Sequence, residues 1–346
     1  MEQCPMTMNR RSFLGCTLTA GCTLSLDQLA ALGQPSPKRI MTVRGWIDSD
    51  QFGVALPHEH IICDFIGADK TGNHRWNRKI VFHRMLPYLE ELKKVNVTTF
   101  FDCTPIYIGR DPVLLKQLAK AANLNIVTNT GYYGGANDKF VPKQAFTMSV
   151  DDVAAQWVKE FEFGIGDSGI HPGFIKIGVD SIKNENDPLS DIDTKIVRAA
   201  AQVSQQTNLS VTCHTGGGFA GLSALRLFLE EGGKAKRFIV AHSDNHGIAI
   251  NKKVADLGGW VSFDAISRRP LKQHLEIVPE MLKHRADRLL ISQDNGWYSV
   301  GEPDGGQVRG YTELHRSFLP ALSKAGVSKD QLEQITEVNP WNAFAI

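Results

Sequence analysis

The stretch GVALPHEHIICDF (residues 53–65) places two histidines, His58 and His60, at the end of an apolar run. In a β-strand, residues two apart lie on one face, so both imidazoles would point the same way and Glu59 the other. Two imidazoles converging from one strand end are half of a zinc-type ligand set, and their spacing is not that of the helical H-E-x-x-H arrangement. Because a chain with 11 histidines can show such a pair by chance, the rest of the sequence must decide.

The overall composition is that of an ordinary globular chain. It has 346 residues, of which 42% are hydrophobic and 22% charged, with a formal net charge of +1. Length alone would suggest about two domains, but α/β barrels often run past about 250 residues as one. The near-neutral charge argues against a nucleic-acid or membrane-surface partner that binds by bulk electrostatics.

The N-terminal segment MNRRSFLGCTLTAGCTLSLDQLAALG (residues 8–33) carries paired Arg10 and Arg11 before a mildly apolar run. We interpret residues 1–33 as a twin-arginine export signal, which predicts a periplasmic or exported protein, and residues 34–346 as a single domain. A charged tail is the alternative. The apolar run is shorter than the roughly 20 residues of a membrane span. The motif LTAGC could be an imperfect lipobox that lipidates Cys22, although Thr19 stands where a leucine is usual.

The cysteines do not predict a disulfide framework. Outside residues 1–33 only Cys63, Cys103 and Cys213 remain, each near the end of a predicted strand. An odd number of this kind is better interpreted as small buried hydrophobic side chains.

The remaining chain alternates strand-like and helix-like segments. Residues 40–53 predict a short hairpin with a turn at Asp48, Ser49 and Asp50, and further helices are expected at the C-terminus. Short apolar strand segments alternate with amphipathic helical segments about eight times, which is the count of a (β/α)8 TIM barrel of the α/β class. A doubly wound sheet is the alternative, but no G-x-G-x-x-G follows the first strand. The predicted strands are 53–62, 97–104, 124–133, 173–180, 209–216, 237–244, 259–266 and 288–294, and the helical segments include 81–95, 111–123, 150–164, 193–207 and 224–233.

Candidate ligands stand at the carboxyl ends of these strands, where barrel enzymes place their chemistry. The two-residue alternation of each strand lets all of them face the barrel axis together. Seven further histidines lie on predicted helices, turns or loops and are expected at the surface or in local hydrogen bonds, with His246 as a rim candidate. The candidate ligands are His58, His60, Lys176, His214, His242 and Asp294.

Lys176 stands between Ile175 and Ile177 in the middle of a predicted barrel strand. A buried, unpaired ammonium is costly, so this lysine must lose its proton, pair, or change chemically. One outcome is a Schiff-base lysine, as in aldolases. The other is a carbamate formed with CO2, a bidentate anion able to bridge two metal ions. The surrounding histidines favour the carbamate.

The motifs LPHEHI, PGFIKIG, VTCHTG, AHSD and SQDN, in this order over residues 42–346, resemble the phosphotriesterase family of the amidohydrolase superfamily. The resemblance implies that His58, His60 and Asp294 hold a buried metal ion and that His214 and His242 hold a more exposed one. Carboxylated Lys176 and a hydroxide would bridge the two ions, usually zinc, with manganese, cobalt or iron as alternatives. It also implies a homodimer.

The chemistry expected from this resemblance is hydrolysis. Two divalent ions would lower the pKa of a bridging water, polarise a carbonyl or phosphoryl oxygen, and leave Asp294 to accept or pass on the proton. Organophosphate triesterases of the family connect this aspartate through a histidine to a second aspartate. Here Ala265 and Asn245 stand at those positions, so the relay is broken twice.

The substrate residues are less defined. Lactonase-like members usually keep a tyrosine after strand three; we predict Tyr132 for this role, with Tyr133 as the alternative, as donor to a developing oxyanion. Arg268 is a catalytic candidate, because it or Arg269 could bind a carboxylate or phosphate bidentately. The alternative for these two arginines is a solvated charge pair. Trp297 and Tyr298 could wall an apolar pocket, or pack beneath the mobile Gly-rich loop 298–311.

The sequence therefore predicts a metal-dependent hydrolase of a small molecule, most consistent with a lactone or carboxylic ester. A phosphotriester or phosphodiester hydrolase on the same metal centre is the alternative. A third alternative is a binding protein on a barrel that has lost its catalytic residues. Loss of Lys176 or Asp294 would favour this alternative, but both residues are present. A Schiff-base lyase would need a carbonyl substrate that can be trapped on Lys176.

Overall fold

A computed structural model of the chain describes residues 37–346. The predicted export signal, with Arg10, Arg11 and Cys22, lies outside these residues. Within the described part of the chain, no helix combines the length and apolar character needed to cross a membrane.

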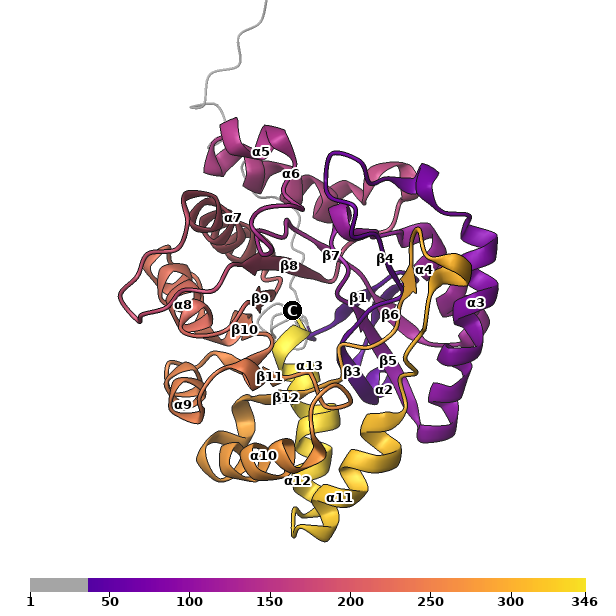
Figure 1. Cartoon of the computed structure of the whole chain (residues 1–346), viewed down its shortest axis with the longest axis vertical. Helices are drawn as coiled ribbons and strands as arrows, with labels where there is room; N and C mark the ends of the chain where they lie inside the picture. The colour runs from indigo at the N-terminus through magenta and orange to yellow at the C-terminus, as the bar shows by residue number, and fades with distance from the viewer. Residues whose placement is uncertain (1–36) are drawn as a thin grey trace, which may run out of the picture. The chain divides into compact units, whose positions relative to one another are not determined.

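The centre of the structure is a ring of parallel strands, which confirms the predicted TIM barrel (Figure 1). One sheet has the order β3-β5-β6 and the other the order β12-β11-β10-β9-β8-β7, and only Thr128 separates β6 from β7 in the chain. Counting β6 and β7 as one gives eight barrel strands. These are β3 (Val54–Glu59), β5 (Val97–Asp102), β6 (Asn125–Val127), β7 (Asn129–Thr130), β8 (Phe174–Val179), β9 (Val211–Thr215), β10 (Phe238–Val240), β11 (Trp260–Phe263) and β12 (Leu289–Ile291).

The barrel closes between its first and last strands through residues beyond the strand ends. Asp294 N donates to His58 O at 3.0 Å, and His60 N donates to Asn295 O at 3.0 Å. The buried carboxylate of Glu59 accepts hydrogen bonds from Gln293 N at 3.0 Å and Asn295 N at 2.7 Å. Glu59 points away from the two histidines, as expected for strand alternation, and ties the loop after β12 to β3.

Helices surround the strands (Figure 1). Their apolar faces pack on the sheet, and their ends carry residues that commonly begin or end helices. In α4, for example, the Asp111 side chain accepts from Leu114 N, Pro112 occupies the first turn, and Leu118 is fully buried. The outer helices are α3 (Arg78–Glu90), α4 (Pro112–Ala122), α5 (Lys143–Thr147), α6 (Val150–Phe163), α7 (Asp191–Thr207), α8 (Ala220–Glu230), α9 (Ile248–Asp256) and α10 (Leu271–Arg285).

The N-terminal hairpin forms from β1 (Ile40–Thr42) and β2 (Gly45–Ile47), but its turn differs from the predicted one. The chain reverses at Val43 and Arg44, whereas Asp48 precedes the short helix α2 (Ser49–Phe52). Asp48 N donates to the Gln51 side chain at 3.1 Å, so the polar residues cap a helix start instead of forming the hairpin turn.

The C-terminal helices α11 (Leu319–Lys324), α12 (Lys329–Glu333) and α13 (Asn339–Phe344) complete the fold. Phe344 of α13 stacks on Phe101 of β5 with ring centroids 4.1 Å apart, and both side chains are buried. Burial of one such ring contributes about 2–3 kcal/mol to stability. Cys63, Cys103 and Cys213 are buried free cysteines, as expected.

Candidate metal centre

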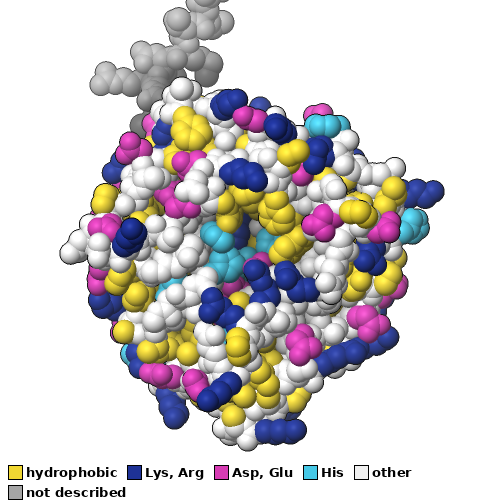
Figure 2. Space-filling model, in the orientation of Figure 1, with side chains coloured by type: hydrophobic (Ala, Val, Ile, Leu, Met, Phe, Trp, Pro, Cys, Tyr) yellow, Lys and Arg dark blue, Asp and Glu magenta, His cyan; other side chains and the backbone are white. Residues whose placement is uncertain are grey.

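The six predicted ligands line one cavity of about 270 Å³ at the carboxyl ends of the barrel strands. Figure 2 shows histidine side chains in the hollow on this face. His58 lies within β3, Lys176 within β8 and His214 within β9. The structure therefore brings together all the residues that the strand-end rule selected.

The first group joins His58, His60 and Asp294, whose ligand atoms lie within 4.8 Å of one another. His60 Nε2 is 3.0 Å from Asp294 Oδ1, and His58 Nε2 is 3.9 Å from the same oxygen. The other nitrogen of His60, Nδ1, is 2.8 Å from Thr104 Oγ1. With Nδ1 engaged by Thr104, Nε2 is the atom that His60 offers to a metal ion.

The second group joins His58, His242 and Asp264. Asp264 is fully buried, and its two carboxylate oxygens accept hydrogen bonds from His58 Nδ1 at 2.8 Å and His242 Nδ1 at 2.7 Å. These bonds fix each ring so that Nε2 carries the free lone pair. We therefore interpret Asp264 as the residue that orients two ligands, and the histidines as the ligands themselves.

Three of the six residues lie just beyond a strand end: His60 directly follows Glu59, the last residue of β3, and His242 and Asp294 lie further from their strands. β10 ends at Val240 and β12 at Ile291, so His242 and Asp294 lie beyond the strands. Their φ angles are 57° and 50°, in the left-handed region that side chains other than glycine rarely adopt. The expected strand alternation therefore does not aim these two side chains, and surrounding contacts hold their backbone instead.

Lys176 is 1% exposed, and its Nζ lies 3.1 Å from His58 Nε2. Among residues 37–346 no carboxylate forms an ion pair with it. The register of β8 and β9 places His214 opposite Gly178, two residues further along the barrel axis. A buried amine among imidazoles, with no anionic partner among residues 37–346, is costly unless it loses its proton or changes chemically.

The electrostatics of the cavity suit metal ligation. Burial lowers the pKa of His58 to about 3, assisted by Lys176, and burial also lowers the pKa of His60 and of His214. These histidines are therefore neutral at physiological pH, which is their metal-binding form. Burial alone would raise the pKa of Asp294, but its bond to His60 and the nearby histidines lower it, so Asp294 is a carboxylate.

The comparisons with known proteins agree with this geometry. Residues 38–344 match the model of the Phosphotriesterase family. This chain belongs to that family. The Escherichia coli phosphotriesterase homology protein is 28% identical, over 85% of this chain and 99% of its own length. The aryldialkylphosphatase of Saccharolobus solfataricus is 25% identical over 86% and 97%, and the N-acetyltaurine hydrolase of Dictyostelium discoideum is 25% identical over 89% and 98%.

The solved structures support the same fold. A variant of the organophosphorus hydrolase from Deinococcus radiodurans superposes with a TM-score of 0.80 at 24% identity, covering 90% of this chain and 98% of its own. Family membership and the two His/Asp groups make this chain a metal-dependent hydrolase of the Phosphotriesterase family with a site suited to two metal ions.

The tyrosine prediction needs a correction. The Tyr132 hydroxyl donates to Gln156 Oε1 at 2.6 Å, and its ring packs edge-on against Trp157 at 5.2 Å, outside the cavity. Tyr133 lines the cavity instead, with its ring centroid 4.7 Å from that of His214. The ring lies over Gly178, where an added Cβ would come within 2.9 Å of it. Strand β7 ends at Thr130, so strand alternation cannot choose between the two tyrosines.

The remaining candidates divide between the cavity and its surroundings. Arg268 lines the cavity, and its Nη1 donates to Asp294 Oδ2. Arg269 donates to the Asn245 side chain at the rim. Trp297 lines the cavity with its ring 5.6 Å from that of His60. Tyr298 is half-buried in β13 (Tyr298–Ser299), which pairs with β4 (Ile62–Cys63), and does not line the cavity.

Sequence reasoning missed Asp264 and Thr104. Asp264 directly follows β11, and Thr104 lies just beyond β5, so the same strand-end rule could have selected both. Among the other histidines, His246 is 3.0 Å from Thr215 and does not line the cavity. His274 is fully buried instead of lying at the surface, and it pairs with Asp244.

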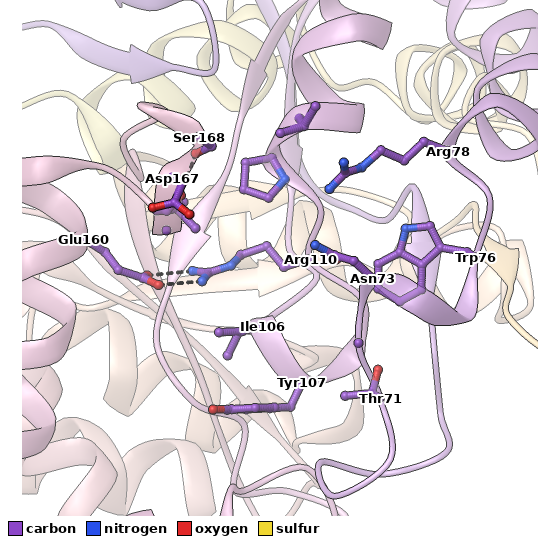
Figure 3. Close-up of a pocket in the computed structure, with 15 residues that line it drawn as sticks. Thr71, Asn73, Trp76, Arg78, Ile106, Tyr107, Arg110, Glu160, Asp167 and Ser168 are labelled. Carbon is purple, nitrogen blue, oxygen red and sulfur yellow. Dashed lines mark hydrogen bonds and ion pairs between the residues drawn. The ribbon is translucent and has the colours of Figure 1, made fainter.

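A larger cavity of about 580 Å³ lies apart from the metal ligands (Figure 3). The Arg110 guanidinium crosses it and meets the Glu160 carboxylate through bonds of 2.6 and 2.8 Å. None of the six candidate ligands lines this cavity. Arg110 and Glu160 neutralise each other, so we assign this pair a structural role.

Proposed function

We propose that this chain hydrolyses a lactone or a carboxylic ester. The observation that carries the proposal is Tyr133, the one tyrosine among the residues lining the metal cavity, which lies beside His214. Burial, and next the charge of Asp294, raise the pKa of Tyr133, so its hydroxyl keeps the proton that it would donate. Such a donor suits the oxyanion that develops when an acyl carbon is attacked.

The residues of the cavity fit two divalent ions. His58, His60 and Asp294 would hold one ion, His214 and His242 the other, and carboxylated Lys176 would bridge them. Zinc is the metal that the family resemblance favours, with manganese, cobalt or iron as alternatives. When bound, the two ions would activate a water molecule and polarise the carbonyl oxygen of the substrate.

The chain's own side chains would perform the remaining steps. Asp264 holds the rings of His58 and His242 in the orientation that ligation needs. Asp294 is ionised and at the cavity wall, so it would accept the proton released by the attacking water. The Tyr133 hydroxyl would then donate a hydrogen bond to the oxygen of the tetrahedral intermediate.

A phosphotriester or phosphodiester hydrolase on the same residues is the competing proposal, since one relative is named an aryldialkylphosphatase. Another relative is named an N-acetyltaurine hydrolase, so acyl substrates also occur among the relatives. The absence of the proton relay argues against hydrolysis of phosphotriesters. Ala265 offers no proton acceptor, Asn245 accepts a hydrogen bond from Arg269, and Arg268 binds the Asp294 carboxylate.

The test is a side-by-side hydrolysis assay on the metal-loaded chain. The substrates are aliphatic and sugar-derived γ- and δ-lactones, aryl esters and an aryl phosphotriester, and Lys176→Ala provides the blank. Lactone or ester turnover well above triester turnover, lost in the blank, is the expected result. A dominant triester rate would replace the proposal by its competitor.

We also propose that the chain is exported through the twin-arginine route. The paired Arg10 and Arg11 before an apolar run support this proposal. Replacement of both by lysine should leave the protein in the cytoplasmic fraction of a bacterial host that exports the unchanged chain. Equal distribution of the two forms would count against export by this route.

A further inference from the structure

One cationic side chain lines the metal cavity, and two exposed ones contact aromatic rings that line it. Arg268 lines it, and the Arg309 guanidinium lies 4.9 Å from the ring centroid of Trp297, which also lines it. The Arg309 backbone exchanges hydrogen bonds of 3.0 and 3.2 Å with Gly296, so this arginine is anchored next to Trp297. Lys139 Nζ lies 5.5 Å from the ring centroid of Phe140, another lining residue. We call Arg268, Arg309 and Lys139 the cationic rim.

The positive charge of the cationic rim is largely uncompensated. Within residues 37–346, neither Arg309 nor Lys139 forms an ion pair with a carboxylate. Arg268 pairs with Asp294, whose negative charge is also required by the metal centre. Burial, and next repulsion from Arg268, lower the pKa of Arg309. Figure 2 shows Lys and Arg side chains gathered beside the histidine-lined hollow.

Contact with an aromatic ring orients the Arg309 guanidinium, and no group among residues 37–346 forms a hydrogen bond with it. A guanidinium in this position presents a planar set of donors that matches a carboxylate or a sulfonate. Arg309 is exposed, and its contact with the Trp297 ring restricts the positions of its guanidinium. Arg268 lines the same cavity as Trp297 and adds positive potential there, which favours an anionic ligand over a neutral one.

We propose that the cationic rim is an anion subsite, and that the preferred substrate carries a carboxylate or sulfonate a few bonds from the scissile carbonyl. This inference rests on the proposed acyl hydrolysis. The carbonyl would lie over the metal ligands, while the anionic group would reach Arg309 and Arg268 at the mouth. Between them the cavity offers apolar walls from Phe65, Ile108 and Phe140, which suit a short hydrocarbon spacer.

The test compares two aryl esters that differ in one group. The monoester 4-nitrophenyl hydrogen glutarate carries a terminal carboxylate, and 4-nitrophenyl pentanoate carries a methyl group at that end. We expect the wild-type kcat/KM to be about tenfold higher for the glutarate ester, as a charge-assisted hydrogen bond would give. Arg309→Gln should reduce this ratio about tenfold. Arg44→Gln, in the exposed hairpin turn outside the cavity, is the matched control and should leave the ratio unchanged.

A binding measurement separates this inference from the proposed function. Glutarate and pentanoate each carry one carboxylate at the same end, and glutarate carries a second one at the other end. Titration calorimetry on the metal-loaded protein should show that glutarate binds more tightly than pentanoate. This difference in affinity should disappear in Arg309→Gln and persist in Arg44→Gln. Ester hydrolysis that depends on Lys176 but shows equal kcat/KM for the two esters would overturn the anion subsite and leave the hydrolase proposal standing. If neither these esters nor the lactones of the assay above are hydrolysed, the proposed function fails. Equal binding of glutarate and pentanoate would overturn the subsite whatever the hydrolysis result.

Discussion

The carboxylate of Asp264 accepts a hydrogen bond from His58 Nδ1 at 2.8 Å, which leaves Nε2 of that ring as the nitrogen that faces Lys176. The other carboxylate oxygen makes the same contact with His242. One buried anion therefore fixes the tautomer and the orientation of a ligand from each predicted metal position. Asp264 therefore couples the two positions.

We predict that Asp264→Asn weakens metal binding about 10- to 100-fold, because an amide cannot accept from both rings with the strength of a carboxylate. Metal content after dialysis against a graded chelator series measures this loss. Ser262→Ala is the matched control, since Ser262 Oγ donates to Asp264 Oδ2 at 3.1 Å without touching a ligand. Its metal affinity should change by much less. Equal metal retention by Asp264→Asn and wild type would remove the orienting role.

The sequence could predict the residues that lie within strands, because strand alternation fixes their direction. His58, Lys176 and His214 follow this rule. Beyond the strand ends, strand alternation no longer fixes the direction of a side chain, and the local backbone angles determine it instead. His242 and Asp294 reach the cavity with left-handed φ angles that no periodicity encodes.

The same limit explains the residues that were misplaced. After β7 the backbone turns at Gly131, whose φ is 118°, and this turn decides that Tyr133 enters the cavity while Tyr132 packs under Gln156. At the N-terminus, Asp48 and its neighbours carry residue types common to turns and to helix starts, so composition alone could not distinguish α2 from a hairpin turn.

A second prediction concerns the chemical state of Lys176. If carbamate formation creates the bridging ligand, metal binding by metal-free protein should require CO2. We expect poor metal uptake in CO2-depleted buffer, recovery on addition of bicarbonate, and no recovery in Lys176→Ala. Calorimetric titration with zinc, or with manganese or cobalt, provides the measurement. Full metal uptake without CO2 would show that the uncarboxylated lysine suffices.

A third prediction separates the two tyrosines. Tyr133→Phe removes the proposed oxyanion donor and should lower kcat for ester or lactone hydrolysis about 100-fold, with a small change in KM. Tyr132→Phe makes the same chemical change one residue away, where the hydroxyl bonds Gln156, and should leave kcat within about twofold. The two kcat values measured side by side decide the assignment. A larger loss in Tyr132→Phe would return the role to Tyr132.

The ion pair in Figure 3, between a buried Arg110 and a half-buried Glu160, supports a prediction about stability. Arg110 is 5% exposed, and its guanidinium pairs with Glu160. Glu160→Leu would leave the arginine buried without its anion and should lower the free energy of unfolding by about 3–5 kcal/mol. Urea denaturation measures the change. The double change Arg110→Met with Glu160→Leu removes both charges and should recover much of the loss, whereas equal destabilisation would indicate that packing, not charge, is responsible.

His315 gives a prediction for pH dependence. Neither of its ring nitrogens has a hydrogen-bond partner among residues 37–346, and burial lowers its pKa to about 4 from a usual value near 6.5. Between these pH values the unfolded chain binds a proton that the folded chain does not, so stability due to this group is complete above about pH 6.5 and falls as the pH drops toward 4. Because His315 is partly exposed, we expect a loss of roughly 2 kcal/mol.

The measurement is urea denaturation of wild type, His315→Gln and His83→Gln at a series of pH values from about 4 to 7.5. His83 is exposed, so its replacement should leave the pH dependence close to that of wild type. His315→Gln should flatten the decline between about pH 6.5 and 4, whatever its effect on stability at neutral pH, because glutamine does not titrate. A decline as steep as in wild type would show that other groups account for it and that His315 is protonated without cost in the folded chain.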